Sequence, residues 1–229
     1  MVIVKMNKWK VTASNSLAEG ILMKKAAGIT CAFLDVGDVL LTDGWDHLAR
    51  KRAAKHFKLE WADMEARHQL TFEVFEVGKL TLEEYLNLVV FYKKRSFTRN
   101  QFRQFMFAQS KPFPEMIDLV IELKQNLGLK IVIVSNESRE VNAFRSRKFG
   151  LDKLSDCFIS SSFVHMRKPD VEIFKLALDL AQVRPSQVVF IDNTPMFVQI
   201  AEGLGIQGIL HKDCKSTRTK LSQLGLNAD

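Results

Sequence analysis

The chain has 229 residues, of which 47% are hydrophobic and 26% are charged, and its formal net charge is +7. A chain of this length can bury one core, or one core with a smaller insert. No apolar run approaches the roughly 20 residues of a transmembrane helix, so no membrane partner is expected. The basic residues are scattered and do not form a stripe with interleaved aromatics, which argues against a nucleic-acid partner.

The N-terminal segment, residues 1–28, carries no motif that suggests chemistry, and we treat it as an extension with a short helix ending at Gly28. It lacks an apolar stretch followed by a small-residue cleavage site, so secretion is not expected. The three cysteines are widely spaced, which favours reduced thiols over a disulfide framework or a zinc site. We therefore predict a cytoplasmic protein, either a monomer or a homodimer.

Three short apolar runs, in residues 29–36, 129–136 and 186–193, each end in polar residues. Near-continuous apolar runs of this length are typical of parallel strands that are covered on both faces. Two further strands are expected at 156–161 and 206–210, and amphipathic helical segments alternate with the strands. This alternation predicts an α/β fold with a Rossmann-like, doubly wound parallel sheet.

The stretch between the first strand and the helix that begins near Pro114 has helical spacing and no strand-like alternation. Two of its expected helices begin with capping-box spacing, Thr81 with Glu84 and Thr98 with Gln101. We predict a four-helix cap inserted after the first strand. The predicted parts are the cap at 46–109 and a core made of 29–45 and 110–229. The aromatic residues expected inside the cap bundle are Phe72, Phe75, Phe91, Phe105 and Phe107.

Polar residues that follow the strands are expected to converge, because ligands bind at the carboxyl ends of the strands in such sheets. In chain order they are Asp35, then Ser135 and Asn136, then Lys168 in "HMRKPD", and finally Asp192. Each of them alone is better explained as a cap, turn or surface residue. Their joint appearance in this order favours a catalytic site.

This pattern resembles the haloacid dehalogenase-like (HAD) hydrolase superfamily, subfamily I with a helical C1-type cap. The resemblance extends from Ile29 to about Leu210. The segments "MRKPDVEIFKLAL" and "VVFIDNTPMFV" are especially similar to the sugar-phosphate (glucose-1-phosphatase-like) phosphatase branch. The resemblance implies a Mg²⁺-dependent hydrolase of small phosphomonoesters, with a sugar phosphate as the expected substrate.

The same resemblance implies a role for each matching residue. Asp35 is the nucleophile that forms an aspartyl-phosphate, and Lys168 neutralises the nucleophile and the phosphate. The hydroxyl of Ser135 and the backbone N–H of Asn136 hydrogen-bond the phosphoryl oxygens. The ligands of Mg²⁺ are the carboxylates of Asp35 and Asp192 and the backbone carbonyl of Gly37.

The sequence departs from the family pattern at Gly37, where phosphatases usually have a second Asp that acts as the general acid and base. This absence leaves two alternatives open. One is a 2-haloacid dehalogenase-type hydrolase, whose halide leaving group needs no proton. The other is a catalytically weak phosphate-binding module. Asp38 lies one position too late to replace the missing Asp, and we expect it in a turn close to the metal.

A second departure is Asn193, which stands where many relatives have Asp, and we expect it near the metal without direct coordination. Substrate choice is expected to depend on the cap and on the stretch that leads into it. The candidate residues at this entrance are Asp43, Trp45, Asp46, His47 and Arg52.

Overall fold

The computed structural model of the protein describes residues 28–227. The predicted N-terminal helix therefore lies outside the described residues. A five-stranded sheet, parallel throughout, has the strand order β3-β2-β1-β4-β5. The strands are β1 (Cys31–Leu34), β2 (Lys130–Ser135), β3 (Cys157–Ser160), β4 (Val188–Asp192) and β5 (Gln207–Leu210). The first strand is central and the chain runs outward to both edges, which confirms the predicted doubly wound sheet.

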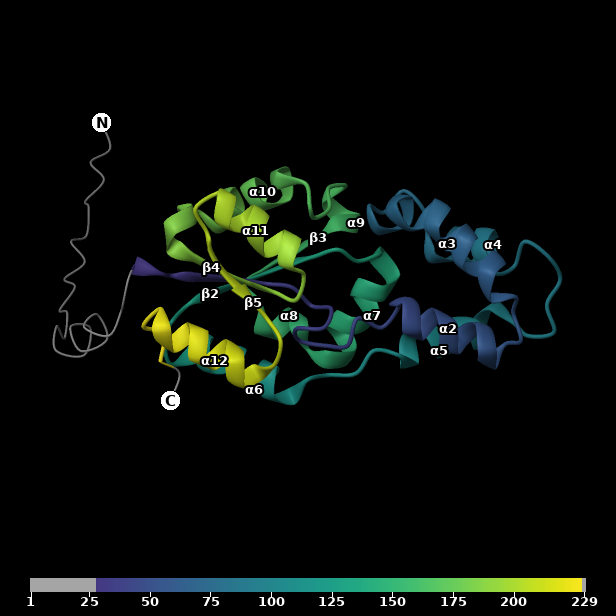
Figure 1. Ribbon diagram of the computed structural model, residues 1–229, viewed down its shortest axis with the longest axis horizontal. Coiled ribbons are helices and arrows are strands. Elements are labelled where there is room, and N and C mark those ends of the chain that lie inside the picture. The colour runs from purple at the N-terminus through teal and green to yellow at the C-terminus, as the bar shows by residue number, and fades with distance from the viewer. Residues whose placement is uncertain (1–27, 228–229) are drawn as a thin grey trace, which may run out of the picture.

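Helices cover both faces of this sheet (Figure 1). Helices α10 (Val171–Ala181) and α11 (Pro195–Gly203) lie on one face, and α6 (Pro114–Gln125), α8 (Leu151–Leu154) and α12 (Cys214–Gln223) lie on the other. The remaining elements of the core are α7 (Arg139–Phe149), α9 (Ser161–Val164) and the 3₁₀-helix η2 (Pro185–Gln187).

The strand residues alternate between two separate hydrophobic clusters. Phe33 packs with Val132 on the α10 side, whereas Leu34 packs with Ile133 on the α6 side. All four side chains are fully buried. Covering both faces explains why the strands have apolar runs and no apolar–polar alternation.

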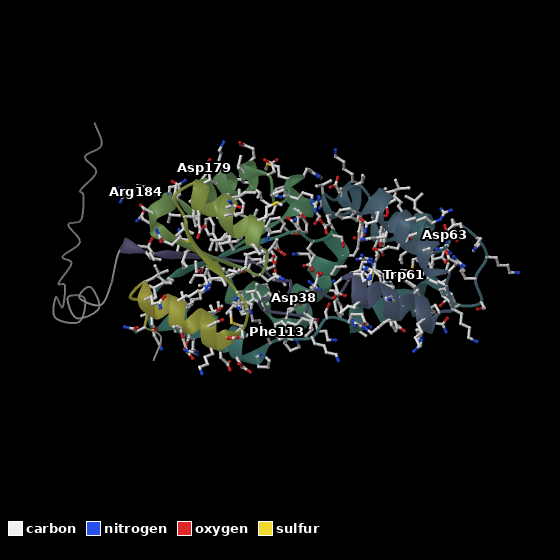
Figure 2. All side chains as sticks on the ribbon, in the orientation of Figure 1. Asp38, Trp61, Asp63, Phe113, Asp179 and Arg184 are labelled. Carbon is white, nitrogen blue, oxygen red and sulfur yellow. The ribbon has the colours of Figure 1, made fainter. Side chains whose placement is uncertain are left out.

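Four helices follow β1 and precede α6 in the chain. They form one end of the molecule, and the core forms the other. The four helices are α2 (His47–His56), α3 (Trp61–Glu76), α4 (Leu82–Val89) and α5 (Arg99–Ala108). Figure 2 shows Trp61 and Asp63 on this part and Asp179 and Arg184 at the other end. Both predicted capping boxes are present, at the starts of α4 and α5.

The aromatic residues of the four helices form most of their common core. Phe75 is buried there, and Phe91, Phe105 and Phe107 pack against the same cluster. Phe72 differs from the prediction, because it is not part of this cluster and lines the cavity between the cap and the core. Helical spacing places Phe72 near the apolar side of α3 but does not show whether that side meets the bundle or the cavity.

Two chain connections join the cap to the core, and Thr42 holds them together. Its hydroxyl donates a hydrogen bond to the Gln109 carbonyl (2.8 Å) and accepts one from the Lys111 N–H (3.0 Å). The residue range 46–109 proposed for the cap falls between these connections.

Candidate active site

The carboxyl ends of the three central strands bring the predicted polar residues together. Asp35 follows β1 directly, Ser135 ends β2 and Asp192 ends β4. Because β1 lies between β2 and β4, these three residues meet at one edge of the sheet. Asp35 and Ser135 line a cavity of about 420 Å³ that the cap helices cover, and Asp192 lies beside it.

Lys168 lies between two carboxylates at the base of this cavity. Its Nζ is 3.0 Å from Asp35 Oδ1 and 2.6 Å from Asp192 Oδ2. The lysine side chain is 1% exposed, and burial by itself disfavours its charge. The two carboxylates outweigh this burial, so the pKa of Lys168 is raised above its ordinary value. The lysine is therefore a fixed positive charge beside Asp35.

Asn136 positions the backbone of Lys168. Its Oδ1 accepts a hydrogen bond from the Lys168 N–H (2.8 Å), and its Nδ2 donates one to the Lys168 carbonyl (2.8 Å). The side chain of Asn136 thus has a structural task. Its backbone N–H is the group assigned to phosphate by the family resemblance. The neighbouring Ser135 is 2% exposed and lines the cavity.

The groups expected to bind a metal offer oxygen ligands only. Lys168 contacts one oxygen of each carboxylate, and the other oxygen of Asp192 accepts a hydrogen bond from the Thr194 N–H (2.7 Å). Each carboxylate retains lone pairs for a further ligand. Residues 28–227 contain no group of three or more His, Cys, Asp and Glu side chains suited to a metal. Two carboxylates, the Gly37 carbonyl and water form a set that suits Mg²⁺, which commonly keeps several waters.

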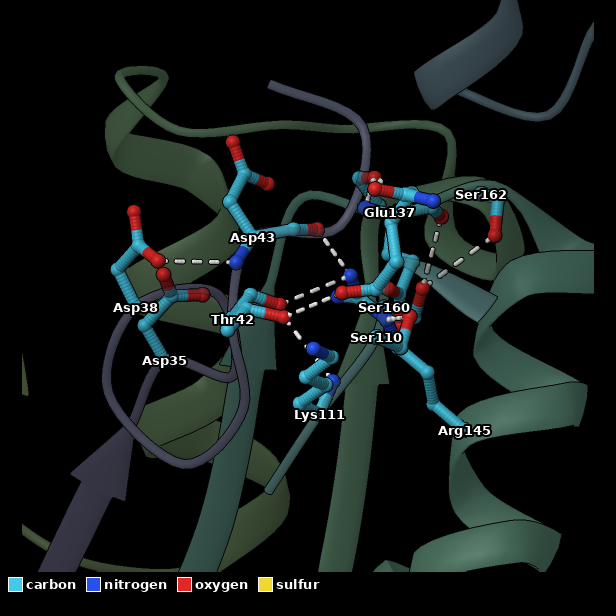
Figure 3. Close-up of polar contacts among 12 residues, drawn as sticks. Asp35, Asp38, Thr42, Asp43, Ser110, Lys111, Glu137, Arg145, Ser160 and Ser162 are labelled. Carbon is cyan, nitrogen blue, oxygen red and sulfur yellow. Dashed lines mark hydrogen bonds and ion pairs between the residues drawn. The ribbon is translucent and has the colours of Figure 1, made fainter. Parts of the chain in front are cut away.

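Asp38 does not line the cavity and supports a turn. Its φ of +51° is in the left-handed region, and its Oδ1 accepts a hydrogen bond from the Asp43 N–H (2.9 Å), as Figure 3 shows. It is absent from the residues that line the cavity, whereas Asn193 lines it beside Thr194.

Asp43 lines the cavity together with Asp35 and Gly37, although sequence reasoning gave it no catalytic role. Its side chain is exposed to solvent, but the protein around the cavity still desolvates its carboxyl. This desolvation raises the pKa of Asp43 to about 6, while Arg145 opposes the rise and Asp38 adds to it.

A buried ion pair holds the loop that carries Asp43. Arg145 pairs with Glu137 (Nη1 to Oε1, 2.5 Å) and donates to the Ser110 hydroxyl from Nε (3.0 Å). From Nη2 it donates to the backbone carbonyls of Thr42 (3.1 Å) and Asp43. Figure 3 shows Arg145 between this loop and Glu137. Burial raises the pKa of Glu137 to about 7, although Arg145 opposes the rise.

Four of the five predicted entrance residues, Asp43, Trp45, Asp46 and His47, line the cavity. The indole N–H of Trp45 donates to the Tyr85 hydroxyl (2.9 Å). Arg52 does not line the cavity, and its Nε instead donates to Gln109 Oε1 (3.0 Å). The prediction that Arg52 faces the entrance is therefore not supported by its position on α2.

Several cavity residues carry no signal that sequence reasoning could use. They are Arg50, His68, Gln69, Phe72, Glu76, Glu137 and Arg145. Most of them lie on helices, where charged and aromatic residues are common on any face. Arg167 and Phe197 are exceptions, because they lie in the "MRKPD" and "VVFIDNTPMFV" segments that carry the family resemblance. The two Nη atoms of Arg167 each lie 3.0 Å from a cap carboxylate, Glu73 and Glu76.

Curated relatives match parts of the chain. Bifunctional epoxide hydrolase 2 of Sus scrofa is 35% identical over 113 residues, which are 48% of this chain and 20% of that protein. The phosphorylated carbohydrates phosphatase of Thermotoga maritima is 27% identical over 145 residues, which are 62% of each protein. The chain thus covers only about a fifth of the first relative and about three fifths of the second.

Solved structures share the fold. A HAD family enzyme of Bacteroides thetaiotaomicron, in complex with magnesium and inorganic phosphate, has a TM-score of 0.69 at 21% identity and covers 81% of this chain and 95% of its own. A HAD-like family hydrolase from Porphyromonas gingivalis has a TM-score of 0.70 at 22% identity, with 86% and 99% covered. L-2-haloacid dehalogenase from Xanthobacter autotrophicus has a TM-score of 0.57 at 15% identity, with 85% and 83% covered.

At these identities the structural likeness shows the fold alone, so family membership depends on the sequence. The family model described as haloacid dehalogenase-like hydrolase matches residues 29–205, which is most of the chain and includes all four predicted motifs. The chain therefore belongs to the haloacid dehalogenase-like hydrolase family.

Proposed function

We propose that the protein is a Mg²⁺-dependent phosphatase of small phosphomonoesters, with a sugar phosphate as its expected substrate. The observation that carries this proposal is the position of Lys168 Nζ, 3.0 Å from Asp35 and 2.6 Å from Asp192 at the base of a covered cavity. The Thermotoga maritima relative, named for phosphorylated carbohydrates, supports the same substrate class.

Asp35 is the proposed nucleophile, because it follows the central strand and faces the cavity. A carboxylate that attacks a phosphate dianion meets like-charge repulsion, and the fixed charge of Lys168 reduces it. An Asp35 oxygen bonds to phosphorus as the bond to the leaving oxygen breaks, and water then hydrolyses the aspartyl-phosphate. Bound Mg²⁺ supplies further positive charge to the phosphoryl oxygens.

The charges that line the cavity favour a substrate with one phosphate and an otherwise neutral body. Among the described residues, three cavity arginines are each paired with carboxylates. The pairs are Arg50 with Glu65, Arg145 with Glu137, and Arg167 with Glu76. Lys168 already faces Asp35 and Asp192. Little positive charge is left for a second phosphate, whereas a hydroxyl-rich sugar can hydrogen-bond to these polar side chains.

The test is steady-state turnover of an aryl phosphate and of a panel of sugar phosphates in the presence of Mg²⁺. The wild-type protein is expected to release phosphate from both, and Asp35→Asn is expected to reduce the rate to background. Asn keeps the shape of the side chain but is a much weaker nucleophile. Equal rates for the two proteins on every substrate would refute the phosphatase proposal.

Two alternatives share this site, and Gly37 is the observation that favours them. A 2-haloacid dehalogenase would release halide at a rate that a metal chelator does not change. A phosphate-binding module would bind tungstate, an analogue of phosphate, without turnover of any ester. The cytoplasmic location and the monomeric or homodimeric state stay predictions.

A further inference from the structure

The loss of the usual acid at Gly37 creates a chemical requirement. When a sugar phosphate is cleaved, the leaving oxygen must take a proton, because an alkoxide is a poor leaving group. In the second step, the attacking water must lose a proton. Gly37 has no side chain that could do either.

We propose that Asp43 is the general acid and base of this enzyme, a role that rests on the proposed phosphatase function. In the first step, the P–O bond to the substrate breaks and the leaving oxygen takes the proton of the Asp43 carboxyl. In the second step, Asp43 takes a proton from water as the water oxygen bonds to phosphorus. The bond between phosphorus and Asp35 then breaks, and both carboxyls return to their starting states.

The position of the Asp43 carboxyl carries this proposal. A Cβ atom added to Gly37 would lie 3.3 Å from Asp43 Oδ1, 3.6 Å from its Cα and 3.8 Å from its Cβ. The Asp43 side chain therefore reaches the space into which a side chain at position 37 would extend. Both residues line the cavity with the nucleophile Asp35.

The backbone on both sides of this carboxyl is fixed. The Asp43 N–H donates to Asp38 Oδ1 (2.9 Å), and the Asp43 carbonyl accepts a hydrogen bond from Arg145. The next residue, Gly44, has a φ of +82°, and a Cβ there would clash with the Arg145 guanidinium. Asp38, the second aspartate of the "DVGD" segment, thus helps to position Asp43.

The other acidic groups of the cavity already have partners. Glu76 and Glu137 pair with Arg167 and Arg145, respectively. Asp46 Oδ1 accepts a hydrogen bond from the N–H of Ala49 at the start of α2 (2.5 Å). Among residues 28–227, no donor is hydrogen-bonded to the Asp43 carboxyl, which leaves it available to a substrate.

The experiment compares Asp43→Asn with the wild type on two Mg²⁺-dependent substrates. An aryl phosphate with an acidic phenol leaves without help, whereas a sugar phosphate needs a proton. We expect Asp43→Asn to lower kcat on the sugar phosphate by roughly 10²–10⁴-fold, the usual contribution of a general acid. The aryl phosphate should lose far less, and KM should change little on either substrate.

Two further variants separate proton transfer from a structural effect. Asp213→Asn makes the same change at the helix cap of α12, outside the cavity, and asparagine is also a good helix cap, so it should leave both rates unchanged. The double variant Gly37→Asp/Asp43→Ala returns a carboxyl to the usual position. Its kcat on the sugar phosphate should be at least tenfold higher than that of Asp43→Ala.

An equal loss on both substrates in Asp43→Asn would overturn the proposed role of Asp43, while the dependence on Asp35 would still support a phosphatase. If the wild type hydrolyses neither phosphate, both proposals fail.

Discussion

Lys168 has a charged side chain that is almost completely withdrawn from water. An unpaired buried ammonium costs several kcal/mol, and a buried carboxylate costs a similar amount. The contacts of Lys168 with Asp35 and Asp192 offset both costs only while the three groups keep their positions. The site therefore depends on the residues that fix the lysine backbone, and Asn136 is the one with two hydrogen bonds to it.

Asn136→Ala is expected to weaken both stability and turnover. It removes two hydrogen bonds from partly buried groups, each worth about 0.5–1.5 kcal/mol net, so the free energy of unfolding should fall by about 1–3 kcal/mol. The backbone N–H assigned to phosphate remains, so kcat should fall more than KM rises. Urea unfolding and steady-state kinetics measure both effects.

Asn193→Ala is the matched control for this change. Its Oδ1 accepts one long hydrogen bond from the Thr194 hydroxyl (3.4 Å), and the side chain is only half-buried. Its effect on stability should lie within about 0.5 kcal/mol, as for most surface substitutions. If the two alanine variants unfold at the same urea concentration, the side chain of Asn136 does not anchor Lys168.

The convergence of Asp35, Ser135 and Asp192 could be predicted, because parallel strands bring their carboxyl ends to one edge of a sheet. The part played by Asp43 could not. Its place depends on positive φ angles at Asp38 and Gly44 and on Arg145, which lies 102 residues further along the chain. Neither loop geometry nor a contact of such separation can be inferred from residue spacing in one sequence.

At the scale of elements, local signals were again more informative than contacts between distant segments. The capping boxes at Thr81 and Thr98 depend on side chains three residues apart and were predicted correctly. The docking of α3 on the core was not predicted. There the Ser161 hydroxyl donates to the Glu76 carbonyl (2.6 Å), and His165 Nδ1 lies 2.8 Å from the Val77 carbonyl oxygen. This contact keeps the cap over the cavity.

Gly78→Ala is expected to disrupt the docked cap. Gly78 follows α3 with a φ of +72°, and an added Cβ would overlap the carbonyl of Ser162 in the core. Alanine in the left-handed region costs about 1 kcal/mol, and the overlap should add about 1–3 kcal/mol. Turnover should also fall, because the cap must shift away from α9. Urea unfolding and kinetics on an aryl phosphate measure the two effects.

Gly128→Ala separates the clash from the backbone strain. Gly128 has a similar φ of +63°, but an added Cβ would have no atom within 4 Å. The free energy of unfolding of Gly128→Ala should therefore fall only by the backbone strain of about 1 kcal/mol, and its turnover should be normal. Equal losses of stability in the two variants would mean that the contact between Gly78 and Ser162 does not restrain the cap.

At the scale of the whole molecule, the active site lies at the junction of two packed parts (Figure 1). Polar and charged groups at such a junction are withdrawn from water without belonging to either hydrophobic core. No helix of the described residues is long and apolar enough to cross a membrane. The junction holds desolvated carboxyls of the site, and Glu137, 6% exposed, is one of them. Its protonation links the stability of the molecule to pH.

Glu137→Gln is expected to change how stability depends on pH. The pKa of Glu137 is about 7 in the folded protein, because burial outweighs the effect of Arg145, and about 4.3 in an unfolded chain. Between these values the folded state binds a proton that the unfolded state lacks, so Glu137 makes the free energy of unfolding fall as pH rises. The variant lacks this contribution, so the stability of the wild type relative to the variant should decrease from pH 5.5 to pH 8.

Glu122→Gln provides the control, since a hydrogen bond from Arg218 lowers the pKa of Glu122, which then titrates below this range. Urea unfolding at several pH values gives the free energy of unfolding as a function of pH. This curve should run parallel to that of the wild type for Glu122→Gln. If the curve for Glu137→Gln also ran parallel to that of the wild type, it would contradict a raised pKa at Glu137.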